Sequence, residues 1–212
     1  MPARTTSKPS AKSLYGVHPG VLMVQDWVAS LKTKTGRSLD EWLTLVRKEA
    51  PKDEAGRRDW LKARHKLGTN SAWWIAKRAG GKGGEEDTPE GYLKVAPKYV
   101  DEMFAGPRTA LRPLYDTLLA LGLAIGKDVK ACPCKTIVPL YRNHVFAQIK
   151  PATNKRIDMG FALGAMKAKG RLIDTGGFAK KDRITHRVPI ETPQDIDAEV
   201  KRWLKTAYDL DG

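Results

Sequence analysis

Hydrophobic residues in the first part of the chain recur with the period of an α-helix. Five of them fall on one helix face: Val21, Val24, Trp27, Val28 and Leu31. Such a stripe is typical of a helix that packs one side against a core. It predicts a first helix that begins after about residue 17 and is ended by Thr35-Gly36-Arg37.

Three further helices are predicted between residues 38 and 79. Ser38 stands three residues before Glu41, the spacing at which each side chain satisfies the other's backbone N–H at a helix start. A third helix is expected over residues 53–67, and Ser71 opens a fourth. Residues 15–79 are therefore predicted to form a small all-helical domain.

A glycine-rich segment follows the helical domain. Gly80-Gly81-Lys82-Gly83-Gly84 precedes Glu85-Glu86-Asp87. Four glycines in five residues hold regular structure only at a large cost in conformational entropy. We therefore place a Gly-rich acidic linker at residues 80–89, and we expect residues 1–14 to form a basic disordered tail.

The pattern changes from helix to strand in the second half of the chain. A long helix is predicted from Pro107 to Gly126, and beyond it the hydrophobic period shortens to two. Six strands are predicted, at residues 129–133, 136–141, 145–150, 156–161, 171–174 and 184–190. A terminal helix follows Thr192. The predicted fold class is α+β, with a small all-helical N-terminal domain and then a helix–antiparallel β-meander–helix domain over residues 90–212.

Composition narrows the class of protein. Of the 212 residues, 41% are hydrophobic and 29% are charged, which excludes a mainly disordered chain, and two cysteines exclude a disulfide scaffold. No apolar run approaches the roughly 20 residues that a membrane-spanning helix needs. The first residues contain no apolar stretch of the signal-peptide type, so we expect a cytoplasmic protein.

The formal net charge of +14 favours polyanionic partners, nucleic acid among them. The excess concentrates in residues 127–187, which carry fourteen lysines and arginines against four acids. If these cations share one rim or one sheet face, they form a phosphate-binding surface. If each lies beside its own carboxylate, they are ordinary solvated loop residues. Tyr141, His144 and Phe178 lie among them and are suited to stack on bases.

The candidate polyanion site is a cationic, hydrogen-bonding group of the second domain. Its members are Lys135, Tyr141, Arg142, Asn143, His144, Lys150, Arg183, His186 and Arg187.

A metal site is a weaker alternative. Cys132 and Cys134, with His144 and His186, supply four ligands of the types that zinc takes. However, the C-x-C spacing is not the usual knuckle and no second cysteine pair exists, so packed reduced thiols are the preferred interpretation.

Catalytic motifs give little support for an enzyme. Asp174-Thr175-Gly176-Gly177 has the form of an aspartic-protease triplet, but that chemistry needs two carboxylates that share a proton, so a glycine-rich turn explains it better. A nuclease-like cluster would need Asp158, Asp174 and Lys135 together. We assign no catalytic residue and no cofactor.

Several segments carry a resemblance that covers nearly all of residues 15–211. They are Val17-His18-Pro19-Gly20 and residues 35–42 and 68–76 in the first half, and residues 134–136, 141–147, 174–178 and 184–187 in the second. On these segments the chain resembles a bacterial two-domain protein that joins an uncharacterised helical family to an uncharacterised α+β family. The resemblance implies a second domain like one found in predicted transport or nuclease-associated proteins, and no catalytic residue is carried over from it.

The sequence therefore predicts a cytosolic binding protein, rather than an enzyme, whose basic α+β domain binds polyanions and most of all nucleic acid. One alternative is a small-anion-binding domain or an undiscovered enzyme, with Lys135, His144 and Arg187 in one pocket. Another is a protein-interaction scaffold, which exposure of Trp73 and Trp74 would support. The oligomeric state is left open.

Overall fold

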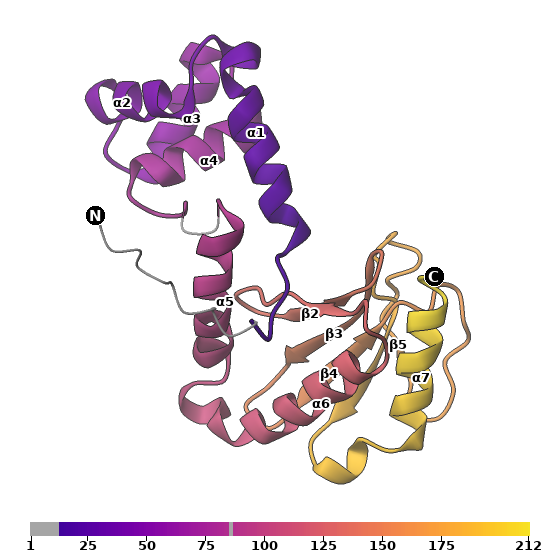
Figure 1. Ribbon diagram of the computed structural model, residues 1–212. Coiled ribbons are helices and arrows are strands. Elements are labelled where there is room, and N and C mark those ends of the chain that lie inside the picture. Colours follow the sequence, from indigo (N-terminus) through magenta and orange to yellow (C-terminus); the bar gives the residue numbers. More distant parts are fainter. Residues whose placement is uncertain (1–12, 85–86) are drawn as a thin grey trace, which may run out of the picture. The chain divides into compact units, whose positions relative to one another are not determined.

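The computed structural model describes residues 13–84 and 87–212, so the predicted tail lies almost wholly outside the described residues. The chain divides into two compact units (Figure 1). A helical unit holds residues 18–92, and an α+β unit holds residues 93–212 together with the segment up to Val17.

The helical unit consists mainly of α1 (Pro19–Thr35), α2 (Leu39–Glu49), α3 (Glu54–His65) and α4 (Thr69–Ala79). The capping box predicted at the start of α2 is confirmed. Glu41 N donates to Ser38 Oγ at 3.3 Å, and Ser38 N donates to Glu41 Oε2 at 2.6 Å. Trp42, Val46, Leu61 and Ile75 from α2, α3 and α4 are buried in one hydrophobic core.

The α+β unit contains the last part of α5 (Pro89–Met103), the 3₁₀ helices η1 (Gly106–Leu111) and η2 (Pro193–Asp195), and the helices α6 (Arg112–Ala124) and α7 (Ala198–Asp209). Its strands are β1 (Lys130–Ala131), β2 (Val138–Tyr141), β3 (Val145–Pro151), β4 (Ile157–Phe161), β5 (Ile173–Asp174) and β6 (His186–Ile190). They form one antiparallel sheet in the order β1-β2-β3-β4-β6-β5. The predicted α+β class is confirmed. The first four strands form the predicted meander, and β6 lies between β4 and β5.

One face of the sheet is buried beneath α6 and α7 (Figure 1). Alternate residues of the central strands point to opposite faces, and Ile149, Met159 and Val188 lie side by side on the buried face. Gly122 of α6 lies directly against the Leu140 side chain, so this helix packs closely on β2. Lys150, Asp158 and Arg187 occupy positions of the opposite parity and form a polar face.

The ends of the sheet separate the loops into two groups. The turn 142–144 joins β2 to β3 at one end, which we call the Asn143 end, and the turn 152–156 joins β3 to β4 at the other. Because the strands are antiparallel, the loop 175–185 that precedes β6 also lies at the Asn143 end. Among the described residues, no helix has the length and apolar character needed to cross a bilayer.

Candidate functional site

The structure divides the nine predicted site residues among several locations. Arg142, Asn143, His144 and Arg183 gather at the Asn143 end, where Tyr141 ends β2. The other four lie apart: Lys150 and Arg187 on the polar face, Lys135 at the opposite end beside the Tyr99 ring, and His186 buried on the helix-covered face.

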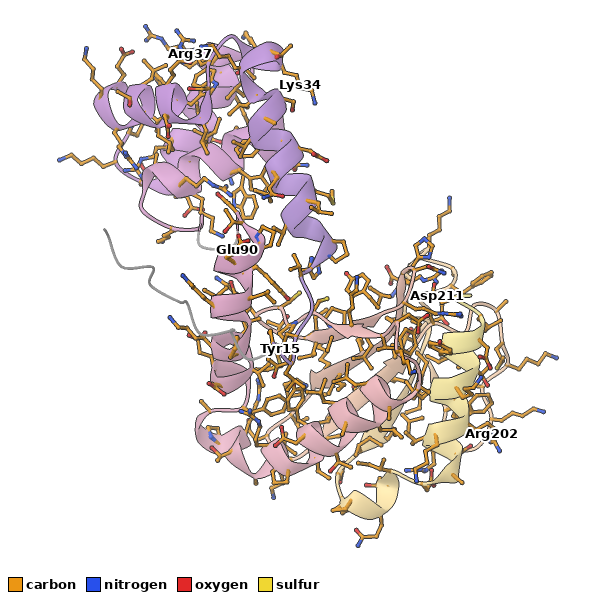
Figure 2. All side chains as sticks on the ribbon, in the orientation of Figure 1. Tyr15, Lys34, Arg37, Glu90, Arg202 and Asp211 are labelled. Atoms are coloured by element: carbon orange, nitrogen blue, oxygen red, sulfur yellow. The ribbon has the colours of Figure 1, made fainter. Side chains whose placement is uncertain are left out.

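Asp211 organises the cluster at the Asn143 end. Its side chain lies just beyond α7 (Figure 2) and is only 1% exposed. One carboxylate oxygen accepts hydrogen bonds from Asn143 N at 3.0 Å and His144 N at 2.8 Å, and the other binds His144 Nδ1 and Arg183 Nη2. These charge-assisted bonds offset the cost of burying the carboxylate. The network fixes the turn 142–144 to the segment after α7.

Arg142 is held in a second ion pair at this end. Its Nε lies 2.9 Å from Asp128 Oδ2, and its guanidinium lies 4.3 Å from the centre of the Tyr208 ring. Tyr208 also donates a hydrogen bond to Asp128 at 2.8 Å. Arg142, and to a smaller extent Tyr208, lower the pKa of Asp128, because both stabilise its ionised form.

The polar face of the sheet holds a similar arrangement. The Asp158 carboxylate lies between Arg156 Nε at 3.0 Å and Arg187 Nη1 at 3.1 Å. The guanidinium of Arg187 is therefore engaged with a carboxylate of its own domain.

Within the described residues 127–187, the arginines form ion pairs with carboxylates and the lysines do not. All five arginines form ion pairs with carboxylates of the α+β unit. Among the described residues, nine lysines form none within 4.0 Å: Lys127, Lys130, Lys135, Lys150, Lys155, Lys167, Lys169, Lys180 and Lys181. The unpaired positive charge of this region is therefore carried by lysine. Four of these lysines, 127, 130, 180 and 181, lie at the Asn143 end, whereas Lys135, Lys150 and Lys155 lie on the polar face or toward the opposite end of the sheet.

The loop after β5 is held by its own hydrogen bonds. Asp174 Oδ1 accepts from Gly176 N at 2.7 Å, Thr175 Oγ1 donates to Thr185 O at 2.9 Å, and Asp182 N donates to Gly177 O at 2.8 Å. Gly176 has a left-handed φ of +69°. A Cβ at Gly177 would lie 2.6 Å from the Ile184 carbonyl oxygen. Asp174-Thr175-Gly176-Gly177 is thus the glycine-rich turn that the sequence predicts.

Phe178 follows this turn and is 58% exposed. It lines a cavity of about 720 Å³, which we call the Phe178 pocket. The other lining residues are Ala162, Leu163, Gly164, Ala179, Lys181, Asp182, Arg183, Thr185 and Leu210. The lining combines apolar side chains and an exposed ring with two cations, Lys181 and Arg183, and one carboxylate, Asp182. The apolar part and the ring are suited to a flat aromatic group.

His186 lies next to Thr185, one of the residues that line the Phe178 pocket. Its ring Nδ1 lies 2.8 Å from Thr185 Oγ1, which accepts a hydrogen bond from Leu163 N at 3.2 Å. His186 is 1% exposed. Thr185 thus links the start of β6 to the segment after β4, and His186 contacts the Thr185 hydroxyl. Burial removes His186 from direct contact with a polyanion.

The thiols and carboxylates considered for chemistry are dispersed. Cys132 is buried, its Sγ lies 3.6 Å from Val17 O, and burial raises the pKa of its thiol to about 12. His144 and His186 have the partners described, Asp158 binds two arginines, and Asp174 caps Gly176. Within residues 13–84 and 87–212, no three His, Cys, Asp or Glu side chains are placed to hold a metal ion.

The sequence singles out Phe178 as a stacking residue and Arg183 as a site residue. The nine-residue candidate site does not include Phe178, the four unpaired lysines of the Asn143 end, Asp211 or the apolar lining of the pocket. Asp211 is separated from His144 by 67 positions, so no local pattern links the two. Leu163 and Leu210 have no signal in the sequence that distinguishes them from core residues.

Two family models match the chain. The model described as Domain of unknown function (DUF5655) matches residues 100–211, and the model described as Domain of unknown function (DUF4287) matches residues 24–79. The first match covers most of the α+β unit, and the second covers most of the helical unit. Comparisons with curated proteins and with solved structures give no match.

Proposed function

The chain belongs to the DUF5655 family, and we propose that its α+β unit is a nucleic-acid-binding module whose contact surface is the Asn143 end of the sheet. The proposal treats the protein as a binding protein rather than an enzyme. It assigns the stacking contact to Phe178 and the phosphate contacts to the unpaired lysines of that end.

The exposed Phe178 ring is the observation that carries the proposal. Burying a phenylalanine side chain stabilises a fold by about 1.5–3 kcal/mol, a gain that an exposed ring forgoes. Here the ring is presented by a turn with several internal hydrogen bonds rather than by a loose loop. Stacking of a base on an aromatic side chain is worth about 1–3 kcal/mol per base. A ring that is already fixed loses little conformational entropy when it stacks.

Unpaired lysines supply the electrostatic part of the interaction. Lys180 and Lys181 follow Phe178 directly, and Lys127 and Lys130 lie at the same end of the sheet. Because none of these lysines forms an ion pair within 4.0 Å, their ammonium groups are available to phosphates. Four phosphate contacts with a single strand predict a log–log salt slope of about −3.

His144 adds a positioned polar contact. Its side chain is 72% exposed, and its Nδ1 is held by Asp211. The carboxylate fixes the orientation of the ring, as an outer carboxylate does for a functional histidine. The remaining edge of the imidazole is turned toward solvent, where it can meet a phosphate or a base.

Fluorescence anisotropy with a labelled 20-nucleotide strand tests the proposal. We expect binding that weakens with salt at about the slope given, and a loss of about tenfold in the double variant Lys180→Glu/Lys181→Glu at low salt. The matched control, Lys150→Glu/Lys155→Glu, changes the same charge away from the Asn143 end and should have a much smaller effect. Absence of binding at low salt, or equal losses in both variants, would reject the proposed surface.

The small-anion alternative has less support from the geometry. It needs Lys135, His144 and Arg187 in one pocket, whereas they lie beside Tyr99, Asp211 and Asp158, respectively.

A docking role for the helical unit is a second candidate function. Trp73 is 41% exposed, with the Lys77 ammonium 5.2 Å from its ring, whereas Trp74 packs edge-on against Trp27. If Trp73→Ala, and not Phe178→Ala, weakens oligonucleotide binding, the contact lies on the helical unit instead.

A further inference from the structure

We infer that the Phe178 pocket receives one unpaired nucleobase, so that the protein prefers single-stranded over duplex nucleic acid. This inference rests on the proposed function and specifies the form of the nucleic acid that the site takes.

The size and lining of the pocket fit a base rather than a phosphate. Its volume of about 720 Å³ falls within the range of cavities that hold small organic ligands. Ala162, Leu163 and Leu210 contribute apolar surface, and Phe178 contributes a ring. Such a lining gains free energy from a flat aromatic group, and the Asp182 carboxylate that also lines the pocket repels a phosphate placed inside it.

The position of Lys181 fits the phosphate attached to that base. Lys181 lines the pocket, forms no ion pair and has a left-handed φ of +61°, which is uncommon for a residue with a side chain. Its backbone N donates to Phe178 O at 3.1 Å, so the ring and the ammonium belong to one turn. A backbone conformation of this kind is kept only where its surroundings enforce it.

Arg183 is the second cation that lines the pocket, and both its Nε and its Nη2 are engaged within the protein. Arg183 donates through Nε to Val145 O at 3.0 Å and through Nη2 to Asp211. Its guanidinium is therefore held in the pocket wall as a positioning element. Lys181 is the cation of the pocket that has no ion-pair partner among the described residues, and the Asp182 carboxylate lines the pocket beside it.

A duplex does not satisfy this arrangement. Its bases are paired and stacked on each other, so a ring within a cavity reaches one only after the base has been extruded. An unpaired base in a single strand enters without that cost. The lysines contact the phosphates of both forms, so electrostatics alone gives no preference for the single strand.

Three probes of equal phosphate number separate the contributions. They are a mixed-sequence single strand, a blunt hairpin duplex, and a strand of abasic residues, each measured with the wild type, Phe178→Ala and Phe178→Tyr. We expect the wild type to bind the single strand about tenfold more tightly than either other probe. Phe178→Ala should reduce the affinity for the single strand to that for the other two, and Phe178→Tyr, which keeps a ring, should restore the preference. Trp73→Ala, which removes an exposed ring from the helical unit, is the control and should leave all three affinities unchanged.

The possible results distinguish this inference from the proposed function. Equal affinity for all three probes in the wild type, or a preference that persists in Phe178→Ala, overturns base insertion while nucleic-acid binding stands. No affinity for any probe at low salt overturns both.

Discussion

Replacing Asp211 by alanine should destabilise the α+β unit. The substitution removes a carboxylate with 1% exposure that accepts hydrogen bonds from two backbone amides, Asn143 N and His144 N, and binds two side chains. The turn 142–144 would keep the bond from Asn143 Nδ2 to the Asp211 carbonyl oxygen at 2.7 Å, but it would lose every bond to the carboxylate.

The magnitude follows from what each partner can do afterwards. The side chains of Arg183 and His144 are largely exposed and regain water, so their share is about 1 kcal/mol or less each. The two backbone N–H groups lose their acceptor, at about 1–3 kcal/mol each where no water replaces it. We therefore expect Asp211→Ala to cost about 3 kcal/mol, and Asp211→Asn, which keeps one acceptor oxygen, about half of that.

Urea unfolding followed by hydrogen exchange of peptides from β3 and β4 measures this cost for the α+β unit alone. The control is Asp209→Ala, which removes an exposed carboxylate that pairs with Lys205 four residues earlier, at a cost of about 0.5 kcal/mol or less. If the free energy of unfolding of Asp211→Ala lies within about 0.5 kcal/mol of the wild-type value, the Asp211 carboxylate does not hold the turn 142–144 in place.

Three further predictions concern the loop, a helix start and pH. Gly177→Ala should weaken oligonucleotide binding without changing the far-UV circular dichroism, because its Cβ would meet the Ile184 carbonyl 2.6 Å away and move Phe178. Asp197→Ala should cost about 1 kcal/mol in chemical denaturation, and Asp197→Ser much less, because Asp197 Oδ1 accepts from two backbone amides at the start of α7. Burial, and then the charges of nearby arginines, lower the pKa of His65. The folded helical unit therefore resists protonation of this ring. Its stability should be complete above the ordinary histidine pKa of about 6.5 and fall as the pH drops through the lower, folded-state value. The difference in unfolding free energy between the wild type and His65→Phe, measured from pH 7 to pH 5, should decrease; a constant difference would contradict this.

Local interactions explain which parts of the fold are predictable from the sequence. The capping box of Ser38 and Glu41 involves neighbours in the chain, and the helix that it begins is predicted within a residue or two. The helix α5 is absent from the predicted elements because Pro97 lies in its interior, where proline removes a hydrogen bond and usually ends a helix. In the structure, the segment predicted as one helix from Pro107 is divided into η1 and α6.

Strand order depends on contacts that a hydrophobic period does not contain. The period of two predicts the strands 145–150 and 156–161 closely, and a short turn joins them. The placement of β6 between β4 and β5 depends on the path of residues 162–172, which no local pattern specifies. The strands β1 and β5 are only two residues long, shorter than the predicted strands 129–133 and 171–174.

The candidate site shows the same division. Residue type alone singles out Phe178 for stacking, and the glycine-rich turn follows from Asp174-Thr175-Gly176-Gly177. The candidate site predicted from the sequence includes Lys135 and Lys150 but none of the four lysines at the Asn143 end. Which cations are already neutralised depends on acids remote in sequence, such as Asp211 for Arg183 and Asp128 for Arg142. The candidate site predicted from the sequence therefore includes arginines whose charge is already engaged in ion pairs in the folded protein.

Photo-crosslinking tests the central claim most directly, because it locates the contact on the chain. A single strand containing 4-thiouridine is irradiated with the full-length protein at low salt, and the adducts are mapped by mass spectrometry. The account predicts adducts on the peptide that carries Phe178, Lys180 and Lys181, and their loss in Phe178→Ala. Adducts confined to the helical unit, or to the turn 152–156 at the opposite end of the sheet, would contradict it.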